Sequence, residues 1–332
     1  MRALITGVTG QDGSYLAERL LERGDRVWGM VRRTSEVDPW RIRHLTPKLN
    51  LVDGDVTDTL SLLTAIEEAK PDVVYHLAAQ SDVGRSWREP LHTAEVTGLG
   101  AVRLFEAVRR AAPKARVYHA STSELFGDAI QLLGGPATSS GPFLPRSPYG
   151  TAKLLAHSTA GWMRDAYGLF ICTGILFNHE SPRRGPNFVT RKVAMGAARI
   201  AAGLQSELRL GNLGARRDWG WAPEYVEAMI KLVEAPRPMD VVVATGQDHS
   251  VEDLCREAFA RVGLDWRDHV RTDAALARPS DIERLVGDPT EALDAIGWRA
   301  EVSFSEMVHR MVAAEVEATS RVADGHQRPG QS

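Results

Sequence analysis

Three glycines with the spacing G-x-x-G-x-x-G, at positions 7, 10 and 13, constrain the fold more than any other feature of the sequence. They follow an apolar run at residues 3–6, which predicts a strand, and precede an amphipathic segment at residues 14–23, which predicts a helix. Such glycines permit a tight turn, so that the helix N-terminus can meet a pyrophosphate. Many loops contain three glycines, but this position favours a dinucleotide site. The expected cofactor contacts in the turn are Gly7, Thr9, Gly10, Gln11, Asp12 and Gly13.

Short apolar runs alternate with amphipathic stretches through the first half of the chain. Further strands are predicted at residues 27–31, 51–52, 73–78 and 116–120, and further helices at residues 60–70 and 97–111. The run at residues 73–78 is almost continuously apolar, as expected for a parallel sheet that is covered on both faces. This order predicts an α/β fold with a doubly wound parallel Rossmann sheet.

The pattern changes after a Gly/Pro/Ser-rich loop at residues 131–148. Ser147 and Pro148 then have the order of a helix cap and first turn. Beyond residue 175 the pattern is less regular and predicts a smaller α/β substrate-binding domain. We expect a cofactor domain of residues 1–178 plus 214–248, a substrate domain of residues 179–213 plus 249–320, and a disordered tail at residues 321–332.

Composition excludes several classes of protein. The 332 residues carry a formal net charge of −3, which argues against a nucleic-acid or membrane-surface binder. No apolar run approaches the roughly 20 residues of a membrane span. The two cysteines, Cys172 and Cys255, are far apart in sequence and are expected to be reduced thiols. No signal-peptide pattern follows Met1, so we expect a cytoplasmic protein.

The end of the second strand bears on cofactor choice. Arg32 and Arg33 stand there, where an arginine can accommodate the 2′-phosphate of NADP and an acidic residue would bind the ribose of NAD. The alternative is a solvated basic pair, but the upstream glycine turn favours NADP. Two turns after later strands can also face the cofactor, although each can equally be a plain strand-to-helix connection. Their candidate contacts are Asp55, Val56, Leu77, Ala78, Ala79 and Ser81.

Four residues form the candidate catalytic group. Tyr149 and Lys153 are four positions apart and share one face of the predicted helix, where the ammonium is expected to lower the pKa of the phenol. Thr122 follows a strand and can hydrogen-bond a substrate hydroxyl. Glu124 suits the base of an elimination, whereas a simple dehydrogenase needs none; a carboxylate that stabilises a helix start is an equally good interpretation.

Five segments together resemble one known family. They are residues 6–16 (TGVTGQDGSYL), 121–127 (STSELFG), 145–153 (PRSPYGTAK), 174–192 (GILFNHESPRRGPNFVTRK) and 211–220 (GNLGARRDWG). The chain is similar here to the GDP-mannose 4,6-dehydratases of the extended short-chain dehydrogenase/reductase superfamily. The resemblance extends from about residue 3 to residue 317, and its NHESPRRG and RDWG segments are far more specific than the glycine turn.

The resemblance implies a redox-neutral reaction that converts GDP-mannose to GDP-4-keto-6-deoxymannose. Tyr149 would deprotonate the sugar 4-hydroxyl while hydride passes from C4 to NADP⁺, and Thr122 would polarise the C4 oxygen. Glu124 would then remove the C5 proton, made acidic by the new ketone, and help the 6-hydroxyl to leave as water before hydride returns to C6. Lys153 would bind the cofactor ribose. The family also implies a homodimer or homotetramer.

The same resemblance assigns further binding residues. Cofactor contacts are implied for His92, His179 and Arg184, in addition to Tyr149 and Lys153. Substrate contacts are implied for Ser81, Thr122, Glu124, Asn178, Asn187, Val189, Lys192, Arg216, Arg278 and Asp281. A diphosphate needs convergent cations, although each arginine can instead be surface-solvated. For Arg216 and Arg217 beside Asp218, a structural ion pair is a further alternative.

Four positions depart from the family pattern, and three other functions compete. His92 replaces a usual tyrosine, Asp82 a histidine, Thr97 an aspartate and Asp281 a glutamate. These departures affect the expected sugar specificity and cofactor affinity but remove no catalytic group. The competing functions are a nucleotide-sugar epimerase or reductase of the same superfamily, a dehydratase acting on another GDP-hexose or a GDP-heptose, and an NADP-binding regulator. Glu124 argues against the first, and the complete catalytic group argues against the last.

Overall fold

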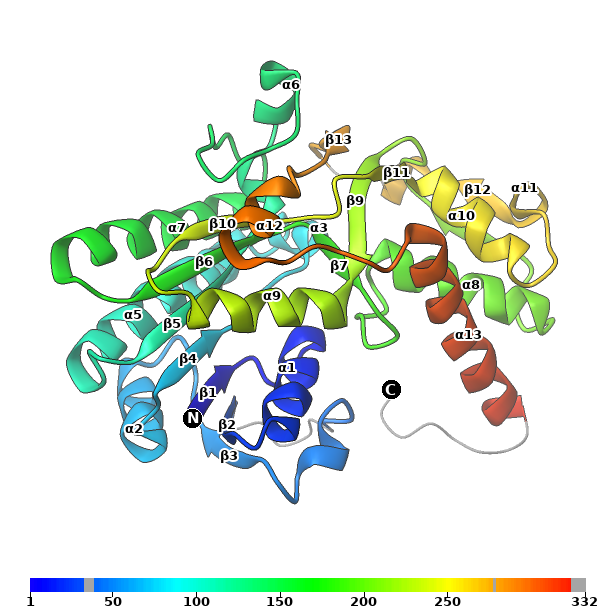
Figure 1. Ribbon diagram of the computed structural model, residues 1–332. Coiled ribbons are helices and arrows are strands. Elements are labelled where there is room, and N and C mark those ends of the chain that lie inside the picture. The colour runs from blue at the N-terminus through cyan, green and yellow to red at the C-terminus, as the bar shows by residue number, and fades with distance from the viewer. Residues whose placement is uncertain (33–38, 277–278, 324–332) are drawn as a thin grey trace.

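A seven-stranded, entirely parallel sheet forms the centre of the computed structural model, which describes residues 1–32, 39–276 and 279–323 (Figure 1). Its strand order is β10-β6-β5-β4-β1-β2-β3, so the order reverses between β1 and β4. The strands are β1 (Arg2–Thr6), β2 (Arg26–Val31), β3 (Asn50–Asp53), β4 (Val73–His76), β5 (Arg116–Thr122), β6 (Ile171–Leu176) and β10 (Asp240–Val243). The predicted doubly wound sheet is confirmed.

Helices cover both faces of this sheet (Figure 1). Successive residues of a strand point to opposite faces, and in these strands both sets are apolar, so each face needs a cover. On one face, Ile5 and Tyr118 pack with residues of α1 and α9. On the other, Leu4 and Val117 pack with residues of α2, α5 and α7. The helices are α1 (Gln11–Glu22), α9 (Ala222–Glu234), α2 (Thr59–Ala69), α5 (Gly100–Ala111) and α7 (Pro148–Tyr167).

A smaller α/β unit lies beside the carboxyl end of the main sheet. In its sheet, β9 pairs with β7, β11 and β13, while β8 and β12 form a separate parallel pair. The strands are β7 (Asn178–Glu180), β8 (Leu208–Leu210), β9 (Arg216–Trp221), β11 (Asp248–Ser250), β12 (Val270–Thr272) and β13 (Arg284–Leu285). The helices α8 (Val189–Ala201), α10 (Val251–Ala260), α11 (Trp266–His269) and α13 (Phe304–Ala323) accompany them. Trp219, Phe259 and Met311 belong to the core of this unit.

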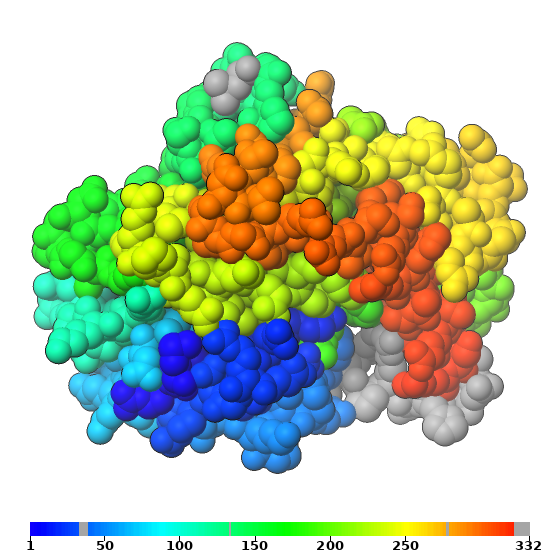
Figure 2. Space-filling view, viewed as in Figure 1, coloured from blue at the N-terminus to red at the C-terminus, as the bar shows by residue number. Residues whose placement is uncertain are grey.

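Short helices fill the remaining connections. They are α3 (Val83–Ser86), α4 (Pro90–Thr93), α6 (Ala129–Leu133), α12 (Thr290–Ile296), the 3₁₀ turns η1 (Arg43–Leu45), η3 (Ser123–Leu125) and η4 (Ala274–Leu276), and the π-helix η2 (Ala94–Leu99). Figure 2 shows α12 and the segment after it (orange) lying over α9, and α13 (red) beside α10.

Element boundaries differ from the predicted ones where tertiary contacts intervene. α1 begins at Gln11 rather than at residue 14, directly after the turn. A π-helical turn precedes α5, and Gly98 there packs against Ala152 of α7, where an added Cβ would lie 3.2 Å from the carbonyl oxygen. The predicted long loop also contains part of α6. Cys172 and Cys255 are buried and form no disulfide, as expected.

The two sheets divide the chain differently from the predicted domains within residues 214–248. The prediction placed residues 214–248 with the main sheet, but within that stretch β9 pairs only with strands of the smaller sheet, while α9 and β10 join the main one. We therefore propose the predicted division with β9 counted in the smaller domain. Most of the predicted tail lies outside the described residues, within which no helix is both long and apolar enough to cross a membrane.

Candidate active site

The glycine turn between β1 and α1 is closed by backbone contacts that leave no room for side chains. Gly7 has φ +75°, and a Cβ placed there would lie 2.8 Å from the backbone nitrogen of Ala78. A Cβ at Gly13 would lie 2.3 Å from the Gly7 carbonyl oxygen. Gly10 precedes the first residue of α1 and accepts a backbone hydrogen bond from Ser14. The turn therefore brings the N-terminal N–H groups of α1 to the edge where β1 and β4 separate, as a pyrophosphate site requires.

Two residues of this turn bind the NHESPRRG segment rather than projecting freely. The His179 Nε2 lies 2.9 Å from the Asp12 carboxylate, and the Gln11 amide donates to the His179 carbonyl at 3.0 Å. The Ser181 hydroxyl donates to the Gln11 side chain at 2.8 Å. The His179 ring also stacks on Tyr225, with ring centroids 4.6 Å apart. These contacts, called here the Asp12–His179 clasp, hold the start of α1 against β7.

In the clasp, the pKa of Asp12 is lowered and the pKa of His179 is raised. Burial alone would raise the pKa of Asp12, but the charge and hydrogen bond of His179, with further contributions from Gln11 and Arg184, lower it to about 2. Burial alone would lower the pKa of His179, but the Asp12 carboxylate raises it above the usual 6.5. Each group of the buried pair therefore favours the charged form of the other.

We expect the clasp to make stability depend on pH. Its contribution is fully present between about pH 4 and the unfolded-state pKa of histidine, near 6.5. It is lost as the pH rises through the raised pKa of His179, and also as acid protonates Asp12. The free energy of unfolding in urea, measured from pH 6 to pH 9, should fall in this range, and His179→Gln should abolish most of the fall. An unchanged slope in this variant would contradict the assignment.

Four of the predicted cofactor contacts lie after β2 and β3. Arg32 is exposed directly after β2, and Arg33 lies outside the described residues. The Asp55 carboxylate accepts hydrogen bonds from the N–H and hydroxyl of Thr57, each at 2.8 Å. Val56 is buried against Gly100. One carboxylate oxygen of Asp55 therefore fixes the turn that follows β3.

The turn after β4 lies over the glycine turn. Leu77, Ala78 and Ala79 are half-buried there, and Ser81 is exposed. The backbone N–H of Ala78 donates to the Thr6 hydroxyl at 3.3 Å, so the ends of the adjacent strands β1 and β4 are tied together. His92, also predicted to contact the cofactor, is exposed on α4.

The predicted catalytic residues come together where β5 ends and α7 begins. Thr122 is the last residue of β5, and the backbone N–H of Glu124 donates to its hydroxyl at 3.3 Å. Tyr149 lies in the first turn of α7, where the Ser147 hydroxyl accepts the Gly150 N–H at 3.0 Å. The hydroxyls of Tyr149 and Thr122 are hydrogen-bonded. A Cβ at Gly150 would lie 2.8 Å from the Glu124 carbonyl oxygen, so glycine permits α7 to pack directly on η3.

Lys153 shares a face with Tyr149 but does not have the predicted effect on its pKa. Its Nζ donates to the Ala120 carbonyl at 2.6 Å and lies 5.9 Å from the Tyr149 ring centroid. Burial lowers the pKa of Lys153 to about 8. Burial also raises the pKa of Tyr149 above its usual value; the hydrogen bond with Thr122 lowers it in part, and the nearby Glu124 charge raises it further. The expected lowering by Lys153 is therefore wrong for this structure, because burial dominates.

The NHESPRRG segment extends from β7 towards α8. The Nε of Arg184 lies 3.1 Å from the Glu180 carboxylate, and its guanidinium lies 3.6 Å from the centroid of the Phe188 ring. The charge of Arg184 also lowers the pKa of Tyr149, which places it near the catalytic residues. The remaining predicted substrate residues of the segment differ in exposure. Asn187 is exposed, and Asn178, Val189 and Lys192 are half-buried.

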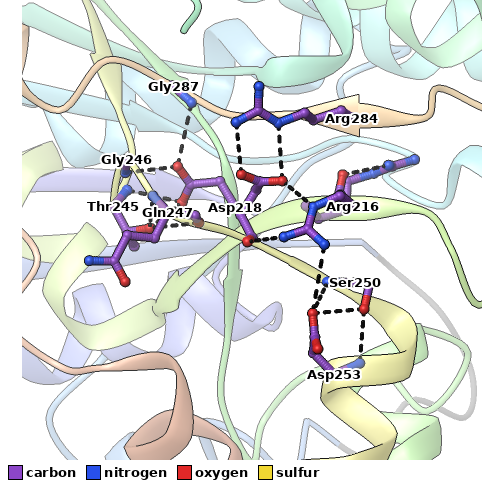
Figure 3. Close-up of polar contacts among 11 residues, drawn as sticks. Arg216, Asp218, Thr245, Gly246, Gln247, Ser250, Asp253, Arg284 and Gly287 are labelled. Atoms are coloured by element: carbon purple, nitrogen blue, oxygen red, sulfur yellow. Dashed lines mark hydrogen bonds and ion pairs between the residues drawn. The ribbon is translucent and has the colours of Figure 1, made fainter.

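Arg216 belongs to an ion-pair cluster on the smaller sheet (Figure 3). Its Nε lies 2.5 Å from Asp248, and its Nη1 lies 3.8 Å from Asp253. Arg284 approaches the same Asp248 carboxylate at 2.9 Å. The Arg216 side chain is still 43% exposed to solvent while it forms these ion pairs. The alternative of a structural ion pair is thus realised, but with Asp248 rather than with Asp218.

The residues that follow Arg216 on β9, Arg217 and Asp218, bind segments that lie farther along the chain. Asp218 is buried and accepts the backbone N–H groups of Thr245 and Gly246 at 3.0 and 2.9 Å (Figure 3). Arg217 is buried, and its Nη2 lies 3.1 Å from the Asp281 carboxylate. Asp281, predicted to contact substrate, therefore holds Arg217, while Arg278 lies outside the described residues.

Comparisons with known proteins agree with this arrangement. The family profile described as GDP-mannose 4,6 dehydratase matches residues 4–311. The GDP-mannose 4,6 dehydratase 2 of Arabidopsis thaliana is 45% identical over 331 residues, covering 96% of this chain and 88% of that protein. The human GDP-mannose 4,6 dehydratase is 44% identical, covering 95% of this chain and 91% of that protein. The chain belongs to the GDP-mannose 4,6-dehydratase family.

Solved structures place this family member among related sugar-nucleotide enzymes. A Thermus thermophilus UDP-glucose 4-epimerase in complex with NAD superimposes with a TM-score of 0.82 at 28% identity, covering 95% of this chain and 99% of that one. The Streptomyces venezuelae dTDP-glucose 4,6-dehydratase DesIV gives a TM-score of 0.84 at 24% identity, covering 96% and 98%, and shows the likeness of fold alone. The resemblance inferred from the sequence motifs is confirmed.

Besides Asp281, two further departures from the family pattern have structural roles in this family member. Asp82 caps α3 by accepting the Arg85 N–H at 3.0 Å. Thr97 is buried, and its hydroxyl accepts the backbone N–H of Gln80 at 3.0 Å. Both residues therefore organise the turn between β4 and α5.

Three residues near the site were not predicted. Ser181 completes the clasp, Arg191 donates to the Arg184 carbonyl at 3.0 Å, and Arg41 donates to the Thr9 carbonyl at 3.3 Å. Ser181 and Arg191 lie inside the segment that carried the resemblance but have no distinctive spacing. Arg41 lies in an irregular connection where no local periodicity marks it.

Proposed function

We propose that the chain catalyses the 4,6-dehydration of GDP-mannose with NADP as its cofactor. The observation that carries this proposal is the position of Glu124, whose backbone binds the Thr122 hydroxyl that is itself bonded to Tyr149. A hydroxyl pair suffices to oxidise an alcohol or reduce a ketone. A carboxylate at the same place supplies what elimination needs in addition, which is a base for a carbon-bound proton and an acid for departing water.

Each residue of the group has a definite task in this reaction. Tyr149 takes the proton of the sugar 4-hydroxyl, and Thr122 hydrogen-bonds the same oxygen as it becomes a carbonyl. A bound nicotinamide cofactor supplies reversible hydride transfer, so that no external reductant is consumed. Glu124 removes the C5 proton once the C4 carbonyl has acidified it, and transfers a proton to the 6-hydroxyl that leaves as water. The buried Lys153, whose Nζ lies 5.9 Å from the Tyr149 ring centroid, would hold the cofactor ribose.

The residues fit a nicotinamide dinucleotide. Added side chains at Gly7 and Gly13 would collide with backbone, so the turn is shaped for close approach to α1. The sequence has Arg32 and Arg33 after β2, where an arginine can accommodate the 2′-phosphate, and this supports NADP over NAD. Substrate phosphates are assigned to Arg216 and Lys192, and the diphosphate needs such cations. The cytoplasmic location expected from the sequence stays a proposal.

We also propose that the chain forms a homodimer or homotetramer. Large apolar side chains are exposed along one set of packed helices: Leu91 (85%), Leu99 (41%), Leu155 (44%) and Trp162 (47%). A second copy of the same surface would remove them from water. Light scattering on the purified protein should give the mass of two or four chains.

The decisive experiment is the incubation of purified protein with GDP-mannose and catalytic NADP⁺. Mass spectrometry should show the loss of one water, and NMR should show a 4-keto-6-deoxy sugar without net formation of NADPH. Recovery of a 4-epimer, or of a reduced sugar that depends on added NADPH, would replace the proposal with an epimerase or reductase. Unchanged GDP-mannose would direct the same assay to other GDP-hexoses and GDP-heptoses.

A further inference from the structure

A row of buried polar side chains crosses the face of the main sheet that α5 and α7 cover. The strands β1, β4, β5, β6 and β10 each contribute one residue at the same level of the register, and these residues are Thr6, His76, His119, Thr173 and Asp240. The first four each lie two positions beyond an apolar residue of the core on this face, so their side chains point to the same side. These four are at most 2% exposed. The five residues are called here the polar row.

The two ends of the polar row have protein partners. At the inner end, the Thr6 hydroxyl and the Nδ1 of His76 are hydrogen-bonded at 2.8 Å. At the sheet edge, Asp240 accepts two hydrogen bonds from Arg164 of α7, each at 2.6 Å. The Nε2 of His157, also on α7, lies 3.9 Å from the same carboxylate. The Arg164 and Asp240 side chains are 17% and 19% exposed, so this end of the row reaches solvent.

The middle of the polar row differs from its ends. Among the described residues, no hydrogen-bond partner is found for either ring nitrogen of His119, for the Thr173 hydroxyl or for the Nδ1 of His157. The His119 ring stacks on His76 with centroids 5.5 Å apart, and Phe105 packs against it edge-on at 5.4 Å, but neither contact satisfies a ring nitrogen. Buried polar groups without a protein partner are usually satisfied by ordered water. The middle of the row therefore has the character of a buried water site.

Lys153 lies beside this part of the row. It stands one turn before His157 on α7, and its Nζ donates to the carbonyl of Ala120, the residue that follows His119. An ammonium has three donors, and this bond uses one of them. Burial and, to a smaller extent, the charge of Lys153 lower the pKa of His76 and of His119, so both rings are neutral at neutral pH. A neutral imidazole has one donor and one acceptor nitrogen, so it can accept a proton on one side and release one on the other.

The proposed reaction requires a way out for a proton. Tyr149 receives the proton of the 4-hydroxyl, and the C4 carbonyl remains in the product, so this proton does not return to the same oxygen. Burial raises the pKa of Tyr149, so its phenol already carries a proton at neutral pH and can accept another only as the first one leaves. Because Tyr149 and Lys153 are both buried, the departing proton needs an internal path.

We propose that the polar row binds buried water and carries the proton displaced from Tyr149, by way of Lys153, to the sheet edge at Asp240; this inference rests on the proposed function. The Lys153 ammonium releases one proton to the first water as it receives one from the side of Tyr149, so its charge does not change. The ring of His119 passes the proton on, and the Thr173 hydroxyl orients the water that follows. Each O–H or N–H bond that breaks is replaced by one that forms, and solvent gains the proton that the 4-hydroxyl lost. His119 and Thr173 act through Lys153 and are positioning residues.

The test compares the turnover and the stability of variants in the middle of the row. His119→Leu removes both ring nitrogens from apolar surroundings. We expect it to lower kcat for GDP-mannose by about tenfold to a hundredfold with little change in KM, because a positioned proton-transfer group is lost. It should not lower the free energy of unfolding, because it leaves fewer buried polar groups unpaired. Thr173→Val keeps the shape and removes one hydroxyl, so it should lower kcat less. The double variant should be no slower than His119→Leu, since both changes interrupt one path.

The ratio of kcat in H₂O to kcat in D₂O separates proton transfer from a structural effect. This ratio should rise in His119→Leu, because proton exit becomes the slow step. His119→Gln, whose amide can bind water as donor and acceptor, should recover part of the lost turnover. Tyr75→Phe is the matched control, since it removes a buried hydroxyl that also lacks a partner in the described part of the chain but lies on the opposite face of the sheet. It should leave kcat and the ratio unchanged. A crystal structure of the unaltered protein should show ordered water beside His119 and Thr173.

The results that would overturn the proposal are distinguishable. Unchanged kcat in His119→Leu and Thr173→Val would remove the row from proton transfer and leave the dehydratase function intact. A loss of kcat that follows a loss of stability, with an unchanged isotope ratio, would make the row structural. Dry surroundings of His119 in the crystal would remove the water on which the path depends. Failure of the unaltered protein to form a 4-keto product would refute the proposed function, and the role of the row with it.

Discussion

Replacing Glu124 by glutamine is expected to slow the dehydration of GDP-mannose by about 10²- to 10⁴-fold while the sugar nucleotide still binds. Glutamine is close to glutamate in size, and the bond from the residue-124 backbone N–H to Thr122 does not involve the altered side chain. The substitution therefore removes the base and leaves the hydroxyl pair of Thr122 and Tyr149 in place. Turnover should be followed by NMR, and GDP-mannose binding by calorimetry.

A second readout isolates the step assigned to Glu124. In D₂O the unaltered enzyme should place solvent deuterium at C5 of the sugar, and Glu124→Gln should lose this exchange together with product formation. Glu67→Gln, which changes an exposed glutamate on α2, provides the matched control and should behave as the unaltered enzyme. Unchanged turnover in Glu124→Gln would remove the residue from the mechanism, and retained C5 exchange would assign the base to another group.

The second large effect is expected on stability, from the ion pair between Arg191 on α8 and Glu315 on α13. The two groups are 2.5 Å apart, and their side chains are only 3% and 5% exposed. Removing one partner takes away the opposite charge that a buried group faces, which typically costs about 3–5 kcal/mol. Glu315→Gln should therefore lower the free energy of unfolding by an amount of this order. Since Arg191 also donates to the Arg184 carbonyl, the NHESPRRG segment should loosen as well.

Urea denaturation of four variants checks this expectation. Glu315→Leu combined with Arg191→Met should recover much of the stability lost in Glu315→Gln, because the double substitution leaves neither charge buried. Glu317→Gln breaks an exposed pair with Arg321 one turn away, and should change stability by less than about 1 kcal/mol. Similar losses for Glu315→Gln and Glu317→Gln would show that burial of the first pair is unimportant. Arg191→Met alone should resemble Glu315→Gln.

Local signals in the sequence predicted much of the fold. The glycine turn, the Ser147 cap and the apolar runs each act over a few residues, so their consequences can be derived without knowing what packs on them. The main sheet was predicted for this reason. The π-helical turn before α5 was missed because its cause is nonlocal, namely the close packing of Gly98 on α7.

The sequence predicted which residues form the candidate site, but not all the contacts that these residues make. Thr122, Glu124 and Tyr149 were predicted together, and the structure brings them together. The ion-pair cluster of Arg216 could not be derived, because pairing of β9 with β11 and β13 brings Asp248 and Arg284 beside it. The direction of the Tyr149 pKa shift was also missed, since burial depends on the whole fold and not on the spacing to Lys153.

The route of the chain between the two sheets has a consequence for biosynthesis. The apolar face formed by β5 and β6 is covered by α9, and the edge beside β6 is completed by β10, but the intervening residues from β7 to β9 belong mainly to the smaller unit. A ribosome must therefore release the chain beyond residue 243 before this side of the cofactor half can close. Until α9 has emerged, Tyr118 and Leu176 lack their α9 partners, and the nascent chain exposes apolar surface. We expect chaperone binding to be concentrated in this interval of translation.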